Sequence, residues 1–121
     1  MVAHQVLVVE DTPTIQEMLV LAFGLSGFRA VVTSSAEEAL TRMRHEQPIA
    51  VLCDVQLPGM NGVEFTALLR SQPEFFRVPV VLMSGHDEPR NHDADAFVAK
   101  PFDPFEVVDR VMQFVGDRPT N

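Results

Sequence analysis

The chain alternates between short apolar runs and longer segments whose apolar residues recur at helical spacing. The short runs, several of them rich in valine, predict strands at residues 5–10, 28–33, 49–53, 78–83 and 96–99. The longer segments predict helices at residues 14–26, 35–45, 61–71 and 103–115. Strands that are apolar throughout are typical of a parallel sheet covered on both faces. The alternation therefore predicts an α/β domain with a parallel sheet.

The predicted helices begin and end at residues that suit those positions. Thr12 and Pro13 suit the start of the first helix as cap and first helical residue, and Gly27 suits its end. Ser35 and Asp103 are the predicted caps of the second and last helices. The first helix is expected to bury one stripe of residues: Ile15, Met18, Leu19, Ala22 and Phe23.

Residues 85–95 interrupt this pattern. The segment is polar almost throughout, contains Pro89, and has no apolar stripe that a helix could bury. We expect a loop or one short turn there, not a helix.

Length, charge and cysteine content narrow the class of protein. With 121 residues, of which 46% are apolar, the chain suits a single domain with a core over about residues 4–116 and a tail or linker stub over 117–121. A net charge of −8 with scattered Lys and Arg argues against direct binding of nucleic acid and favours protein partners. Cys53 is the only cysteine, and neither a signal peptide nor a membrane-spanning run is present, so we expect a soluble cytoplasmic protein.

Polar residues stand at the ends of four predicted strands. Glu10 and Asp11 come at the end of the first strand, Asp54 after the third, Ser84 after the fourth and Lys100 after the fifth. Ligands of an open parallel sheet bind outside the carboxyl ends of its strands, so these side chains are expected to converge. Three carboxylates in one pocket stay ionised together only with a cation among them, and Mg²⁺ prefers such oxygen ligands. The sequence therefore predicts a site for Mg²⁺ and a phosphoryl group.

The same residues resemble the receiver domains of two-component response regulators, over nearly the whole chain. The resemblance rests on the Glu10-Asp11 pair, the run from Asp54 to Gly62, Ser84-Gly85 and Lys100-Pro101-Phe102, in that order along the chain. It implies a doubly wound, five-stranded parallel sheet of the flavodoxin-like (CheY-like) type.

The resemblance also implies a role for each residue of the site. Asp54 would be the phosphoacceptor, and Ser84 and Lys100 would hold the phosphoryl oxygens. The implied Mg²⁺ ligands are Glu10, Asp11, Asp54 and the backbone carbonyl of Gln56. Phe97 matches the aromatic residue that turns inward with Ser84 on phosphorylation, and the Lys100–Pro101 peptide bond matches the family's cis bond.

The chain departs from the family between Ser84 and Lys100. Only 16 positions separate these residues, which leaves the fourth helix of the family absent or reduced to a turn. By resemblance, that face reports phosphorylation and forms the usual dimer interface. A homodimer of this chain would therefore be expected to use an altered surface.

Three hypotheses about function follow. In the first, a sensor histidine kinase or a phosphotransfer protein phosphorylates Asp54, the domain catalyses only its own phosphorylation and dephosphorylation, and its changed surface binds a downstream protein. The chain is then a stand-alone receiver or a part of a longer regulator or hybrid kinase. The second, a small aspartyl-phosphate hydrolase, would need an acid where Gln56 stands. The third is a degenerate receiver that serves only as a constitutive docking module. It would require the loss of a site residue, and none is lost in this sequence.

Overall fold

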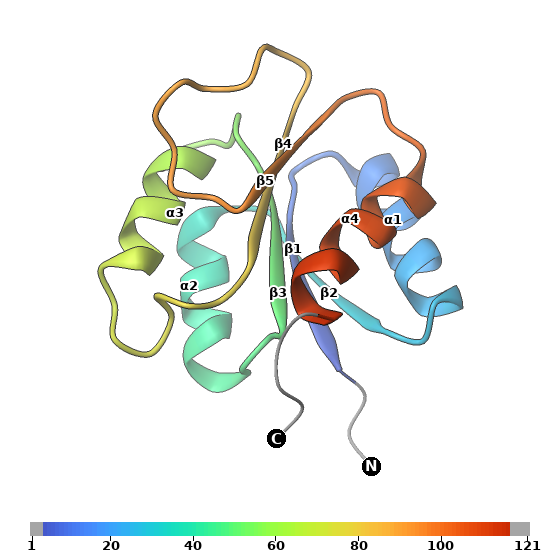
Figure 1. Ribbon diagram of the computed structural model, residues 1–121, viewed down its shortest axis with the longest axis horizontal. Helices are drawn as coiled ribbons and strands as arrows, with labels where there is room; N and C mark the ends of the chain where they lie inside the picture. Colours follow the sequence, from blue (N-terminus) through green and yellow to red (C-terminus); the bar gives the residue numbers. More distant parts are fainter. Residues whose placement is uncertain (1–3, 117–121) are drawn as a thin grey trace.

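Five parallel strands form one sheet in the order β2-β1-β3-β4-β5 in the computed structural model, which describes residues 4–116 (Figure 1). The strands are β1 Gln5–Val9, β2 Arg29–Thr33, β3 Ala50–Asp54, β4 Val80–Ser84 and β5 Ala96–Ala99. The helices are α1 Pro13–Leu25, α2 Ala36–His45, α3 Gly62–Arg70 and α4 Pro104–Gly116. The strand order reverses beside β1, which confirms the predicted doubly wound sheet. The predicted tail, residues 117–121, lies outside the described residues.

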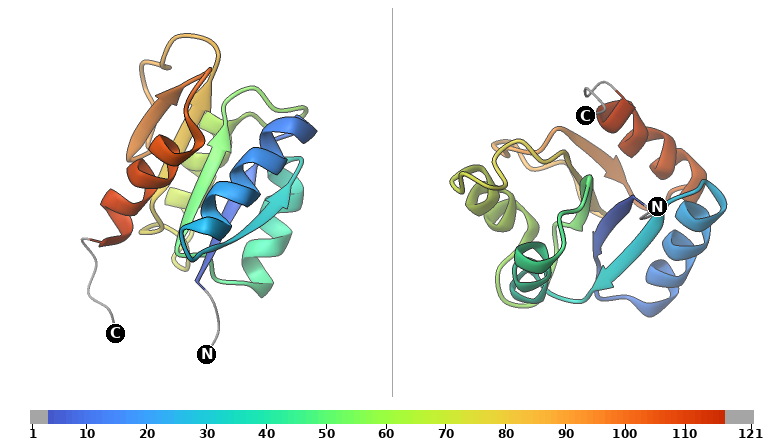
Figure 2. Two further views of the ribbon diagram at one scale, coloured as in Figure 1. Left: turned by 90° about the vertical axis from the view of Figure 1, so that its right-hand side faces the viewer. Right: turned by 90° about the horizontal axis from the view of Figure 1, so that it is seen from below.

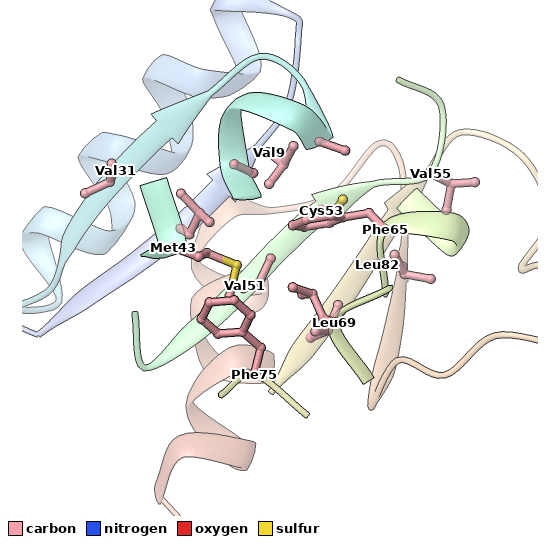
Figure 3. Close-up of a cluster of buried hydrophobic side chains, with 14 residues drawn as sticks. Val9, Val31, Met43, Val51, Cys53, Val55, Phe65, Leu69, Phe75 and Leu82 are labelled. Atoms are coloured by element: carbon pink, nitrogen blue, oxygen red, sulfur yellow. The ribbon is translucent and has the colours of Figure 1, made fainter. Parts of the chain in front are cut away.

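Helices cover both faces of this sheet. Helices α1 and α4 lie on one face and α2 and α3 on the other (Figures 1 and 2). In β1, Val6 and Val8 pack toward α1 and α4, whereas Leu7 and Val9 pack toward α2 and α3. Figure 3 shows the buried cluster on the α2–α3 face. Because both faces are covered, apolar residues occupy successive strand positions, which is the pattern seen in the sequence.

Local hydrogen bonds explain where the helices begin and end. The Ser35 side chain accepts the backbone N–H of Glu38 at the start of α2, as predicted. Asn61 and Glu64 form a reciprocal capping box at the start of α3. Gly27 follows α1 with φ +91°, a conformation that favours glycine.

Two details of α1 differ from the prediction. Met18 is 40% exposed and does not belong to the buried stripe. This helix carries apolar residues around most of its circumference, so spacing alone could not tell its inner face from its outer one. The side chain of Thr12 makes no capping hydrogen bond, although Thr12 is the N-cap residue. The Thr12 backbone N–H donates to the Glu10 carboxylate at 2.9 Å.

The connection from β4 to β5 contains no helix between residues 85 and 95, all of which the structure describes, so the predicted loss of a helix is confirmed. Arg70, at the end of α3, fastens the far end of this connection. Its guanidinium donates to the Asp93 carbonyl at 3.0 Å and pairs with the Asp95 carboxylate at 3.0 Å. It also donates to the carbonyls of Phe76 and Val78, before β4. One side chain therefore joins the segments that lead into β4 and β5.

Arg70→Ala is expected to lower the free energy of unfolding by about 2–3 kcal/mol, because three backbone carbonyls lose the Arg70 donor and the Asp95 carboxylate loses its ion pair. Urea denaturation measures this change. Arg44→Ala, at an exposed position of α2, serves as the control and should change stability by less than about 0.5 kcal/mol. Equal effects of the two substitutions would show that Arg70 does not anchor the connection.

Candidate functional site

The polar residues predicted to converge do converge at the carboxyl edge of the sheet. Glu10 directly follows β1, Asp54 and Ser84 are the last residues of β3 and β4, and Lys100 directly follows β5. Glu10 and Ser84 are fully buried and Asp54 is 4% exposed. Buried charged groups of this kind need partners, so their contacts decide what the site can do.

Lys100 bridges the two buried carboxylates. Its Nζ lies 2.8 Å from Glu10 Oε1 and 3.0 Å from Asp54 Oδ2. The remaining oxygens accept backbone N–H groups, Glu10 Oε2 from Thr12 at 2.9 Å and Asp54 Oδ1 from Gln56 at 3.2 Å. Every oxygen of both carboxylates is thus hydrogen-bonded, which makes their burial tolerable.

Burial nevertheless disfavours the charge of Asp54. It raises the pKa of the Asp54 carboxyl above its usual value; the hydrogen bond from Lys100 lowers this pKa without cancelling the effect, and the nearby charge of Glu10 raises it further. For Lys100, burial lowers the pKa, but the hydrogen bonds with Glu10 and Asp54 outweigh burial, so the pKa ends above its usual value. The ammonium is therefore charged at neutral pH, and the Asp54 carboxylate is held in a less favourable state than in water.

The acidic residues fit a divalent cation. One carboxylate oxygen from each of Glu10, Asp11 and Asp54 lies within 4.8 Å of the others. Asp11 is exposed, so the cluster opens to solvent on its side. Several hard oxygen donors with access to water are the environment that Mg²⁺ prefers. The three carboxylates are thus consistent with a metal site. That the backbone carbonyl of Gln56 is a further metal ligand stays a prediction.

Ser84 makes contacts that the sequence did not predict. Its hydroxyl donates to the side-chain carbonyl oxygen of Gln56 at 2.7 Å and accepts the backbone N–H of His86 at 2.9 Å. On the sequence alone, only the backbone carbonyl of Gln56 is expected in the site. The position of Gln56, two residues after Asp54, indicated that its side chain could lie near the site. No rule of spacing, however, predicts that this side chain reaches Ser84 at the end of β4. Gln56 therefore touches both Asp54 and Ser84.

Three further features near the site are the Lys100–Pro101 peptide bond, Phe97 and Cys53. The Lys100–Pro101 peptide bond is cis, as expected. Phe97 is partly buried and packs against the cluster of the α2–α3 face, so its switch role stays a prediction. Burial and the nearby charges of Asp54 and Glu10 raise the pKa of the Cys53 thiol, which is therefore protonated at neutral pH.

Gly62 allows the start of α3 to lie close to the backbone of Asp54. A Cβ atom at this position would lie 2.3 Å from the carbonyl oxygen of Asp54, a distance that backbone atoms cannot accept. The Gly62 backbone N–H donates to the carbonyl of Val55 at 2.9 Å, which holds the start of α3 against the end of β3. The glycine thus helps to fix the backbone that carries Asp54.

Comparison with known proteins assigns the chain to a family. The family model of the response regulator receiver domain matches residues 6–112, so the chain belongs to this family. The chain is 36% identical over 114 residues to the DNA-binding response regulator MtrA of Mycolicibacterium smegmatis, covering 89% of this chain and 49% of that protein. It is 30% identical over 115 residues to the phosphate regulon transcriptional regulatory protein PhoB of Escherichia coli, covering 90% and 50%. The chain thus spans about half the length of these relatives.

Solved structures agree on the architecture. The signal receiver domain of a signal transduction histidine kinase from Syntrophus aciditrophicus superposes with a TM-score of 0.89 at 27% identity, covering 98% of this chain and 96% of that one. The receiver domain of the sensor histidine kinase PA1611 from Pseudomonas aeruginosa, which holds a magnesium ion in its active-site cleft, gives 0.86 at 23% identity, covering 96% and 100%. Within residues 4–116 of the present chain, no helix has the length and apolar character to cross a bilayer.

Gly62→Ala is expected to lower the free energy of unfolding by about 1–3 kcal/mol, because the added Cβ displaces the backbone of Asp54. Gly24→Ala, within α1, is the matched control, since a Cβ there meets nothing within 4 Å and alanine favours the helix by about 0.5–1 kcal/mol. Thermal denaturation should show opposite signs for the two substitutions. Stabilisation by both would contradict the close approach at Gly62.

The raised pKa of Asp54 predicts a pH-dependent stability. Between the unfolded and folded pKa values the folded chain binds the proton more tightly, so the ionised carboxylate costs stability at neutral pH and the cost disappears as pH falls through the folded pKa. With EDTA present, Asp54→Asn should be more stable than wild type at pH 7, and the difference should shrink as the pH falls through the folded pKa. Asp87→Asn in the exposed connection is the control. A difference independent of pH would contradict this account.

Proposed function

We propose that Asp54 accepts a phosphoryl group from a sensor histidine kinase or a phosphotransfer protein, and that this modification changes a surface which binds a downstream protein. The observation that carries the proposal is the Asp54 carboxylate, buried at the strand-order reversal and held 3.0 Å from the Lys100 ammonium. A carboxylate in this position can act as a nucleophile, and the same ammonium can neutralise the anion that results.

The transfer needs an attacking oxygen and positive charge around the phosphoryl oxygens. An oxygen of Asp54 forms the new P–O bond while the P–N bond of the donor phosphohistidine breaks, and the departing imidazole keeps the electron pair and takes up a proton. Lys100 faces the charge that spreads over the phosphoryl oxygens. Glu10, Asp11 and Asp54 would hold Mg²⁺, which supplies Lewis-acid stabilisation when bound. The domain then acts only on its own Asp54, as both catalyst and substrate.

A hydrolase acting on an external substrate is less well supported. Such an enzyme would need a general acid near the nucleophile for the leaving group. Gln56 has no carboxyl group, and its side-chain oxygen is engaged by Ser84. Within residues 4–116 the chain forms one α/β unit without a second unit to enclose a substrate. Phosphorylation of the domain itself is therefore the better proposal.

The length of the relatives favours a second setting for the same chemistry. MtrA and PhoB are named as a DNA-binding response regulator and a transcriptional regulatory protein, and each is about twice as long as the matched region. The present domain would then be the receiver half of such a regulator, and its downstream partner would be an attached DNA-binding half. A cytoplasmic location and pairing of two receiver domains are compatible with either setting.

Acetyl phosphate with Mg²⁺ is expected to add one phosphoryl group to the wild-type protein, because a reactive phosphoryl donor can replace the kinase. Intact-mass spectrometry should show the added mass, and Asp54→Asn should remove it. Asp87→Asn serves as the control for acidic residues outside the site and should be modified like the wild type. A wild-type chain without added mass, or a phosphoryl group on Asp54→Asn, would overturn the proposal.

A further inference from the structure

The hydroxyl of Ser84 has a single proton, and that proton is already engaged. Ser84 lies at the end of β4 and is fully buried. Its Oγ donates to Gln56 Oε1 at 2.7 Å, a short distance for a neutral hydrogen bond. A buried hydroxyl without an acceptor is costly, so this contact satisfies a real requirement of the ground state.

The predicted role of Ser84 requires the same proton. To hold a phosphoryl oxygen on Asp54, the hydroxyl must donate to that oxygen and so release Gln56. Gln56 stands on the loop directly after β3, where its backbone N–H donates to Asp54 Oδ1 at 3.2 Å. One residue therefore touches the acceptor carboxylate through its backbone and the switch hydroxyl through its side chain.

We propose that the Gln56 side chain is a positioning residue that competes with the phosphoryl group for the Ser84 proton, and thereby restrains the switch in the unmodified domain. The inference rests on the proposed phosphorylation of Asp54. The unmodified domain is stabilised by the Ser84–Gln56 hydrogen bond, whereas the modified one gains a hydrogen bond to a charged oxygen, which is the stronger kind. The difference between the two sets how strongly phosphorylation moves Ser84.

Release of Ser84 also affects the connection that replaces a helix. The Ser84 hydroxyl accepts the backbone N–H of His86 at 2.9 Å, and His86 lies at the start of this connection. Movement of the Ser84 Oγ toward a phosphoryl oxygen would break this hydrogen bond as well as the one to Gln56, because the oxygen that accepts the His86 N–H is itself displaced. Arg70 meanwhile holds the far end of the connection through Asp93 and Asp95. The rearrangement is thus confined to the end of the connection next to the site.

A purely structural role for Gln56 predicts a different result. If Gln56 only satisfied a buried hydroxyl, its loss would lower stability without changing the affinity for a phosphoryl analogue. If it competes for the proton, its loss must strengthen binding of the analogue, and only through Ser84. The two accounts are therefore separated by an affinity and by a double-mutant cycle.

The test uses beryllofluoride with Mg²⁺ as the phosphoryl analogue and titrates it by NMR, following the amide resonance of His86. Gln56→Met keeps the length of the side chain and removes the amide acceptor. We expect it to bind beryllofluoride about 3- to 10-fold more tightly than wild type, the gain from deleting one competing neutral hydrogen bond. In the unliganded protein, the His86 amide resonance should already shift from its wild-type position toward the bound one.

Two further variants make the interpretation specific. In a Ser84→Ala background, Gln56→Met should change the affinity by less than about 1.5-fold, because the proton under competition is gone. Gln113→Met, an exposed glutamine of α4, should match the wild type. Unchanged or weaker binding by Gln56→Met, or equal tightening with and without Ser84, would overturn this inference while leaving the proposed function intact. Failure of the wild type to bind beryllofluoride would overturn the proposed function and this inference with it.

Discussion

The site depends on one ammonium group, that of Lys100, which holds two buried carboxylates at 2.8 and 3.0 Å. Two acids buried side by side without a cation would repel each other and lose their hydration, which costs several kcal/mol per ion. Lys100 can reach Glu10 and Asp54 only because β5 adds to the sheet parallel to β4, with its carboxyl end at the edge where β1 and β3 also end. The sheet order is therefore the condition for the site.

The parallel pairing of β5 with β4 constrains the connection between these two strands. A parallel neighbour requires the chain to return along the whole length of the sheet, and an α-helix usually makes this crossover. Here residues 85–95 return without one, and the lost packing is replaced in part by the hydrogen bonds of Arg70. Asp95 serves twice, since the same carboxylate oxygen accepts the backbone N–H of Val80 at 2.8 Å. The starts of β4 and β5 are thus aligned by polar contacts instead of by a helix.

Hydrogen bonds link Asp54, Gln56, Ser84 and His86 in the site as the structure shows it, without a phosphoryl group. Burial raises the pKa of the Asp54 carboxyl, the Ser84 hydroxyl donates its proton to Gln56, and the backbone N–H of His86 donates to the same hydroxyl. Phosphorylation would change the charge at the first of these groups, and the others are linked to it in sequence through Gln56. A short chain of contacts therefore leads from Asp54 through Gln56 and Ser84 to His86, at the start of the connection between β4 and β5.

The sequence by itself determined the sheet, the order of its elements and five converging polar residues, because hydrophobic periodicity and residues at strand ends depend on local positions in the chain. It also indicated the missing helix, since residues 85–95 offer no apolar face. It could not decide that Met18 faces solvent, because α1 is apolar on both sides. Only the tertiary structure revealed the side-chain bond from Gln56 to Ser84 and the reach of Arg70 to Asp95. Such contacts join residues 28 and 25 positions apart, and their geometry depends on how whole strands and helices pack, which no local pattern encodes.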